Sequence, residues 1–268
     1  MTAELPPDDV DVFVGPDLPA MKIGRGPRTL VSLPGLSLHP GHPTGQARRM
    51  ALTGWGPLLD RYTVYRVGRR VRPVGTDFQE MANDVIAAID LIGPPVDLEG
   101  ASTGGIIALH VAAVRPDLVR RLVLVASGTT ASPFLRARLD RVSAAVRAGR
   151  WRRVNAMIFP IGARSRPLRL VYGALGWLLG PRLAGIPDDP TLMLAELDAW
   201  KRVDADHLVS HVTCPTLVLA GDRDPVFPLV AARELADKLP DGKLIAMPRT
   251  AHDFPASAIA DHISPFLG

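Results

Sequence analysis

Short apolar runs alternate along this chain with segments of helical periodicity, and this alternation strongly constrains the fold. Strands that are joined through helices run parallel, in a sheet that helices cover on both faces. We therefore expect an α/β protein with a mostly parallel, doubly wound sheet. The predicted strands of this sheet are Val10 to Val14, Ala20 to Ile23, Thr29 to Leu33, Tyr62 to Val67, Val96 to Leu98, Leu122 to Ala126, Thr216 to Ala220 and Lys243 to Met247.

One long segment interrupts this alternation. From Thr129 to about Leu208 the pattern is helical and rich in arginine, and Asp140 is the only acidic residue between Ser132 and Arg182. The strand pattern resumes afterwards. We expect residues 1–128 and 209–268 to form the α/β core and residues 129–208 to form an inserted helical cap.

Composition excludes several other classes of protein. The single cysteine, Cys214, rules out an internal disulfide framework and a multi-cysteine metal site. The net charge of +4 is too small to indicate nucleic acid. The N-terminus has no signal-peptide pattern, and Arg169 interrupts the apolar run Leu168 to Gly180, which is too short to span a bilayer. We expect a cytoplasmic protein with a small-molecule substrate, without nucleic acid, membrane insertion, metal or organic cofactor; the sequence does not indicate an oligomeric state.

The segment Gly100-Ala-Ser-Thr-Gly104 fits the pattern G-x-S-x-G. An apolar strand precedes it and an apolar helix follows, which is the setting of a nucleophile elbow. There the turn strains the serine backbone, the glycines avoid clashes, and the helix N-terminus favours a developing anion. Ser102 is therefore the candidate nucleophile.

A serine hydroxyl needs a base within hydrogen-bond reach and an acid that orients this base. His252 follows the last predicted strand and is the candidate base; His262 falls in the final helix, and His207 and His211 precede a strand. Asp222 and Asp224 both follow the penultimate strand. The chain turns at Gly221, so Asp224 is better placed at the loop tip and is the preferred acid, with Asp222 as the alternative. The order serine, aspartate, histidine along the chain is the one expected of this architecture.

Two backbone N–H groups are candidates for an oxyanion hole. Thr103 N–H follows the nucleophile directly, and Leu36 N–H follows the strand that ends at Pro34-Gly35. Loss of one such donor typically costs about 2.7–4 kcal/mol of transition-state stabilisation.

With these motifs the chain resembles the α/β-hydrolase-fold proteins that carry a helical cap. The segments that carry the resemblance are Leu98-Glu-Gly-Ala-Ser-Thr-Gly-Gly105, Thr216-Leu-Val-Leu-Ala-Gly-Asp-Arg-Asp-Pro225 and the histidine after the last strand. Members commonly have His-Gly where this chain has Pro34-Gly35, and histidine where it has Ala101. Dehalogenases and epoxide hydrolases of this fold have aspartate at the position of Ser102.

Further residues raise hypotheses of their own. Glu99 lies in the strand before the elbow, so it should be hydrogen-bonded, ion-paired or protonated, and we expect it to buttress the elbow. Apolar cap residues either pack the cap onto the sheet or line an acyl pocket, and Trp151, Phe159 and Trp177 are the candidate pocket residues. The cap arginines fit a solvated helix face, or they attract an anionic substrate or partner.

The leading functional hypothesis is hydrolysis of a carboxylic ester, thioester or lactone of an apolar substrate of small to medium size, through an acyl-enzyme. Two alternatives stay open. Carbon–carbon bond hydrolases, lyases and acyltransferases of this fold use similar residues, and a non-catalytic binding protein could keep the fold.

Overall fold

The computed structural model describes residues 9–15, 17–37, 41–70 and 77–268, and in this part of the chain eight strands form one sheet. The strand order is β1-β2-β4-β3-β5-β6-β7-β8. The strands β3 to β8 pair in parallel, whereas β1 and β2 pair antiparallel with each other and β2 pairs antiparallel with β4. The strands are β1 (Val10–Val14), β2 (Leu18–Ile23), β3 (Arg28–Leu33), β4 (Tyr62–Val67), β5 (Val96–Ala101), β6 (Val119–Val125), β7 (Thr216–Gly221) and β8 (Gly242–Met247).

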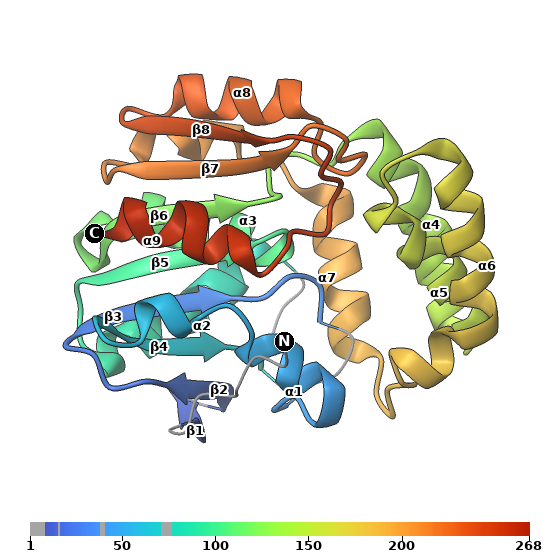
Figure 1. Ribbon diagram of the computed structural model, residues 1–268, viewed down its shortest axis with the longest axis horizontal. Coiled ribbons are helices and arrows are strands. Elements are labelled where there is room, and N and C mark those ends of the chain that lie inside the picture. The colour runs from blue at the N-terminus through green and yellow to red at the C-terminus, as the bar shows by residue number, and fades with distance from the viewer. Residues whose placement is uncertain (1–8, 16, 38–40, 71–76) are drawn as a thin grey trace.

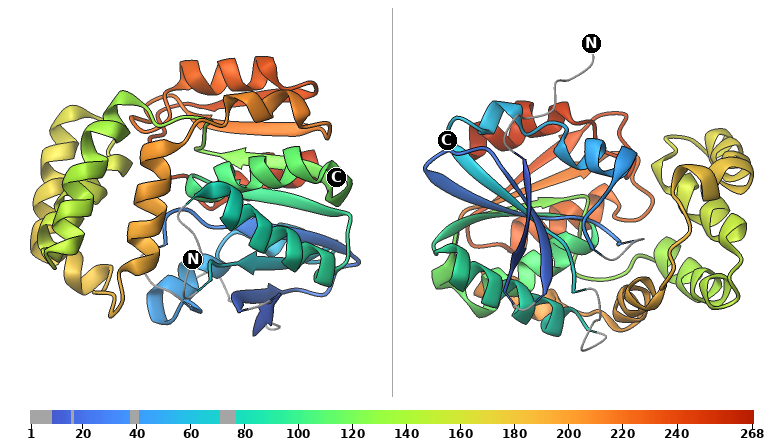
Figure 2. Two further views of the ribbon diagram at one scale, coloured as in Figure 1. Left: turned by 180° about the vertical axis from the view of Figure 1, so that it is seen from behind. Right: turned by 90° about the horizontal axis from the view of Figure 1, so that it is seen from below.

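Helices cover both faces of the sheet (Figures 1 and 2). Alternate residues of β6 show the two-sided burial, since Leu122 and Leu124 pack on one face with α2, α3 and α8, while Val123 and Val125 pack on the other with α1 and α9. The expected α/β fold with a mostly parallel, doubly wound sheet is confirmed. These helices are α1 (Gly45–Leu52), α2 (Phe78–Ile92), α3 (Thr103–Val114), α8 (Leu229–Lys238) and α9 (Ser264–Leu267), the last preceded by a π-helical turn at Ile259–Ile263.

A helical insert of four longer helices separates β6 from β7. Figure 1 shows α4, α5 and α6 as a layer beyond the end of the sheet, with α7 between this layer and the core. The helices are α4 (Pro133–Arg147), α5 (Trp151–Ile158), α6 (Arg166–Leu183) and α7 (Thr191–Arg202).

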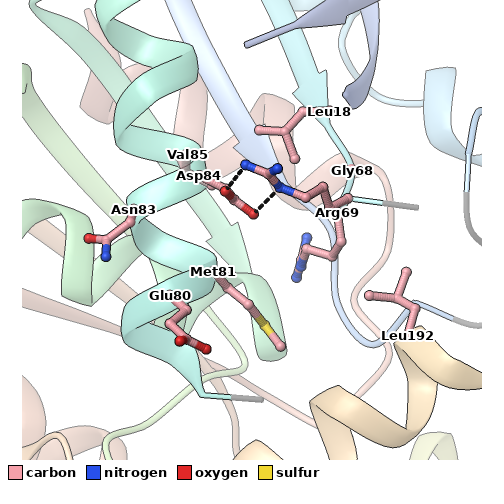
Figure 3. A pocket seen from close by; sticks show the side chains of 10 residues that line it. Leu18, Gly68, Arg69, Glu80, Met81, Asn83, Asp84, Val85 and Leu192 are labelled. Atoms are coloured by element: carbon pink, nitrogen blue, oxygen red, sulfur yellow. Dashed lines mark hydrogen bonds and ion pairs between the residues drawn. The ribbon is translucent and has the colours of Figure 1, made fainter. Parts of the chain in front are cut away.

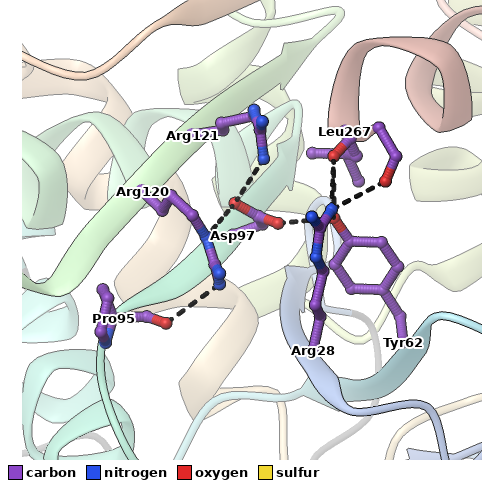
Figure 4. A network of polar contacts seen from close by, with 8 residues as sticks. Arg28, Tyr62, Pro95, Asp97, Arg120, Arg121 and Leu267 are labelled. Carbon is purple, nitrogen blue, oxygen red and sulfur yellow. Dashed lines mark hydrogen bonds and ion pairs between the residues drawn. The ribbon is translucent and has the colours of Figure 1, made fainter.

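At the end of the sheet away from the helical insert, a buried carboxylate connects the strands to the C-terminal helix (Figure 4). Asp97 is fully buried in β5 and accepts hydrogen bonds from Tyr62 Oη (2.7 Å) and Arg120 Nε (3.2 Å). Tyr62 Oη lies 3.0 Å from the carbonyl oxygen of Leu267, and Arg28 donates to the same carbonyl. This network anchors α9 at the amino end of the parallel strands, away from the carboxyl ends where a site is expected.

Candidate active site

Ser102 occupies a strained turn between β5 and α3. Its φ of 50° and ψ of −114° lie outside the regions that non-glycine residues favour. The turn needs glycine on both sides, because a Cβ on Gly100 would lie 2.3 Å from Gly104 O, and one on Gly104 would lie 2.0 Å from Leu33 O. The close approach of the helix to the strands therefore accounts for both glycines of the G-x-S-x-G pattern.

The structure brings Ser102, His252 and Asp224 together in one hydrogen-bonded chain. His252 Nε2 lies 3.0 Å from Ser102 Oγ, and His252 Nδ1 lies 2.9 Å from Asp224 Oδ2. The other oxygen of Asp224, Oδ1, accepts the N–H groups of Val226 (2.7 Å) and Phe227 (3.2 Å). Because these donors stabilise the ionised carboxylate and hold it in place, the arrangement can orient the imidazole and accept the serine proton.

Asp222, the alternative acid, has a different contact. It is exposed, and its Oδ1 accepts the N–H of Thr250 at 3.1 Å. A second bond, from Arg223 N–H to the Thr250 carbonyl at 2.9 Å, joins the same two loops. Asp222 therefore ties the loop after β7 to the loop that carries His252, and it does not contact the imidazole.

Ser102 and His252 line an apolar cavity of about 90 Å³ between the core and the helical insert. The candidate oxyanion residues Leu36 and Thr103 line this cavity as well. Thr103 is the first residue of α3, where N–H groups have no acceptor within the helix. The remaining lining residues are Leu135, Arg138, Leu139, Val142, Met157, Ile158, Ile161, Leu197, Trp200, Val226 and Phe227.

The cap residues chosen from the sequence as pocket candidates do not line this cavity. Trp151 and Phe159 are half-buried, and Trp177 is 47% exposed on α6. Ile158 and Met157, one and two positions before Phe159, line the cavity instead, since a shift of one or two positions on a helix turns a side chain to another face. Large apolar side chains of α6 are also exposed, so they neither pack onto the sheet nor line the pocket.

Trp200 and Phe227 are pocket residues that the sequence reasoning missed. Trp200 is buried in α7 and donates from Nε1 to Thr103 Oγ1 at 3.0 Å. Phe227 packs between the rings of Trp200 (5.5 Å between centroids) and His252 (5.8 Å). Its place three residues after Asp224 was a usable signal, because the loop that carries the acid also borders the pocket.

A buried ion pair supports the loop that carries Leu36. Arg69 Nε and Glu196 Oε1 are 3.1 Å apart, and both side chains are at most 4% exposed. Glu196 Oε2 accepts Ser37 N–H at 2.7 Å, and Arg69 Nη2 donates to Pro34 O at 2.6 Å. Burial raises the pKa of Glu196 to about 7, and the positive charge of Arg69 offsets part of this shift.

Arg69 also borders a second cavity, of about 210 Å³ (Figure 3). Met81 of α2 and Leu192 of α7 line it with Arg69, and at its rim Arg70 pairs with Asp84 at 2.9 Å from Nε. The ion pair between Arg69 and Glu196 thus links the core to α7 of the helical insert.

Glu99 is buried in β5 and accepts a hydrogen bond from Ser32 Oγ at 2.6 Å. Burial raises the pKa of its carboxyl, and the Ser32 hydrogen bond and the charge of Arg66 partly offset this shift. The contact joins β3 to β5 just before the loops that carry Leu36 and Ser102. A role in supporting the elbow stays a prediction: Glu99→Val should lower the melting temperature or the turnover.

Residues 13–256 match the family model of the alpha/beta hydrolase fold. This match covers most of the chain, which therefore belongs to that family.

Among curated proteins, the chain is similar to pimeloyl-[acyl-carrier protein] methyl ester esterases. It is 30% identical to the enzyme of Neisseria meningitidis serogroup C over 188 residues, 66% of this chain and 68% of the relative. It is 28% identical to the enzyme of Chromobacterium violaceum over 263 residues, 90% of this chain and 96% of the relative.

Solved structures of other hydrolases show the same fold. An esterase from Thermogutta terrifontis superimposes with a TM-score of 0.70 at 19% identity, covering 97% of this chain and 96% of the other. An enol-lactonase from Burkholderia xenovorans gives a TM-score of 0.71 at 18% identity, covering 96% and 98%.

Proposed function

We propose that this protein is a serine esterase that cleaves carboxylic esters through an acyl-enzyme. The observation that carries the proposal is the unbroken chain from Ser102 Oγ to His252 (3.0 Å) and from His252 to the buried Asp224 (2.9 Å). The esterase relatives support it, since they pair this fold with ester hydrolysis.

In the first half-reaction Ser102 Oγ attacks the ester carbonyl carbon while His252 Nε2 takes the hydroxyl proton. The carbonyl oxygen becomes an oxyanion, which the N–H groups of Leu36 and Thr103 stabilise. The intermediate then collapses, the C–O bond to the alcohol breaks, and His252 returns the proton to the departing alkoxide. Ser102 is left acylated.

In the second half-reaction water attacks the acyl carbon and gives a proton to His252. The second tetrahedral intermediate collapses, the bond to Ser102 breaks, and His252 protonates Ser102 Oγ. The carboxylic acid leaves. Throughout, Asp224 holds the imidazole in one orientation and stabilises its protonated form.

The cavity restricts the acyl group. A volume of about 90 Å³ is well below the roughly 300–1,000 Å³ of sites for drug-sized ligands. The wall around Ser102 consists mainly of aliphatic and aromatic side chains, among them Leu139, Val142 and Trp200. We therefore assign a short apolar acyl chain as the preferred group; thioesters and lactones with such a group would react by the same steps.

The test is hydrolysis of p-nitrophenyl esters of increasing acyl length by the wild type, Ser102→Ala and a matched control, Ser257→Ala, whose serine is exposed near the C-terminus. We expect turnover in the wild type and the control, with a preference for short chains, and only background rates in Ser102→Ala. A fluorophosphonate should phosphonylate Ser102 Oγ with loss of fluoride in the wild type and in Ser257→Ala, but not in Ser102→Ala. Equal rates in wild type and Ser102→Ala would reject the proposal and direct attention to carbon–carbon substrates and ligand binding.

A further inference from the structure

Helix α6 places small residues against its neighbours and leaves its large apolar residues exposed. Its inward face carries Gly176 and Gly180, both buried, whereas Leu170 is 79% exposed and Leu178 60% exposed. Glycine is required inside, because a Cβ on Gly176 would lie 2.4 Å from Asn155 O and one on Gly180 would lie 2.3 Å from Asn155 Cβ. Small residues therefore bring α6 close to α5, and the large apolar side chains are left on the outside.

The exposed apolar side chains gather on this one part of the surface. Among the described residues, fifteen large hydrophobic side chains are exposed, and nine of them lie between 168 and 186. Scattered apolar side chains are ordinary on a protein surface, but a contiguous group marks an interaction site. We call this group the α6 face: Leu168, Leu170, Val171, Leu175, Trp177, Leu178, Leu179, Leu183 and Ile186.

The surroundings of the α6 face are positively charged. From residue 141 to residue 187 the chain has nine arginines and no aspartate or glutamate, and Asp188 and Asp189 are the acidic residues that follow this segment. Arg152 and Arg153 are exposed on the neighbouring α5, and Arg166 and Arg182 are exposed near the two ends of α6. A partner for this surface should therefore combine an apolar interior with negative charge at its boundary.

We propose that the α6 face binds the surface of an anionic lipid bilayer, with α6 lying in the plane of the interface. Exposed Leu, Val and Trp side chains close to exposed arginines suit a helix in the membrane interface, which enters the headgroup region by about 5–10 Å. Anionic headgroups then meet the arginines. Among the described residues, none of the helices has the length and hydropathy of a membrane span.

The charge distribution disfavours a second copy of the chain as the occupant. A two-fold dimer through the α6 face would place the same arginine-rich surface of both copies together. Like charges across an interface oppose association. A bilayer also suits the position of α6, which forms the outer edge of the molecule in both views that show it from the side (Figures 1 and 2).

The experiment is co-flotation with phosphatidylcholine vesicles that contain either no anionic lipid or roughly one-third phosphatidylglycerol. We expect the wild type to float with the anionic vesicles, and raising NaCl to about 0.5 M to weaken the charge-dependent part of the binding. Leu170→Gln/Leu178→Gln should lower the partition coefficient about tenfold or more, because two exposed leucines would no longer enter the interface. Leu91→Gln, a change at a leucine that is 72% exposed on α2, is the matched control and should bind as the wild type does.

Two readouts keep this inference separate from the proposed function. Ser102→Ala should float with the vesicles like the wild type, and Leu170→Gln/Leu178→Gln should keep wild-type turnover of a soluble ester. Absence of the wild type from the anionic vesicles, or equal flotation of the double variant, would overturn the inference. A concentration-dependent dimer in sedimentation velocity that the double variant abolishes, without vesicle binding, would assign the α6 face to a second copy instead.

Discussion

Glu196 of α7 and Arg69 after β4 form a buried ion pair, with 3.1 Å between Glu196 Oε1 and Arg69 Nε. The two side chains also hold the loop that carries Leu36, through Ser37 N–H on one side and Pro34 O on the other. A helix of the insert and the core thus share control of the loop that supplies a proposed oxyanion donor.

We predict that Glu196→Ala lowers the free energy of unfolding by about 3 kcal/mol, because it leaves the Arg69 charge buried without a counter-charge. It should also lower kcat for a p-nitrophenyl ester, since Ser37 N–H loses its acceptor and the oxyanion loop relaxes. Urea unfolding and steady-state kinetics measure the two effects.

A double variant separates these effects. Arg69→Met/Glu196→Leu removes both charges, so most of the lost stability should return. The hydrogen bonds to Pro34 O and Ser37 N–H are still missing, so kcat should stay low. Full recovery of kcat along with stability would show that the pair does not position the loop.

Trp200→Phe should reduce kcat with little change in folding. The variant keeps an aromatic ring between Phe78 and Phe227 but removes the donor to Thr103 Oγ1, a buried bond of 3.0 Å. We expect the free energy of unfolding to fall by about 1 kcal/mol. We also expect kcat to decrease by a larger factor than KM changes, because Thr103 N–H is a proposed oxyanion donor. An increase in KM alone would assign Trp200 to substrate binding instead.

Asp97→Asn should destabilise the protein without changing its turnover. The fully buried carboxylate accepts from Tyr62 Oη and Arg120 Nε, and we expect its neutralisation to lower the unfolding free energy by about 2–3 kcal/mol. Ser102 lies at the other end of β5, so kcat/KM should be unaffected. Asp117→Asn, at an exposed ion pair with Arg115, is the control and should change stability little.

His110 should make the protein less stable in mild acid. Burial, and secondarily the nearby His207, lowers the pKa of His110 to about 4, against an ordinary value of 6.5. The folded state therefore favours neutral His110; the resulting stability is fully present above about pH 6.5 and is lost as the pH falls toward 4. When the pH falls from about 7.5 to about 5, the unfolding free energy should decrease in both proteins. The decrease should be about 1–2 kcal/mol smaller in His110→Gln than in the wild type. His211→Gln, at an exposed histidine, should follow the wild type; the same pH dependence in His110→Gln would contradict the prediction.

The sequence alone determined the strand-helix alternation and the candidate residues Ser102, His252 and Asp224. Strands buried on both faces are mainly apolar, and a strand-turn-helix elbow needs its glycines, so both features are visible in the order of residues. The preference for Asp224 over Asp222 rested on loop geometry, and the structure places Asp224 against the imidazole.

Only the tertiary structure decided which side chains surround Ser102 and which remain outside. Periodicity shows that a helix has an apolar face but does not show what that face meets. In α6 the tightly packed positions are glycines, because α5 lies too close for larger residues, and Trp177 therefore points outward rather than into the pocket. The pair between Glu196 and Arg69 was equally hidden, since its two residues are far apart in the chain and only the packing of α7 against the core brings them together.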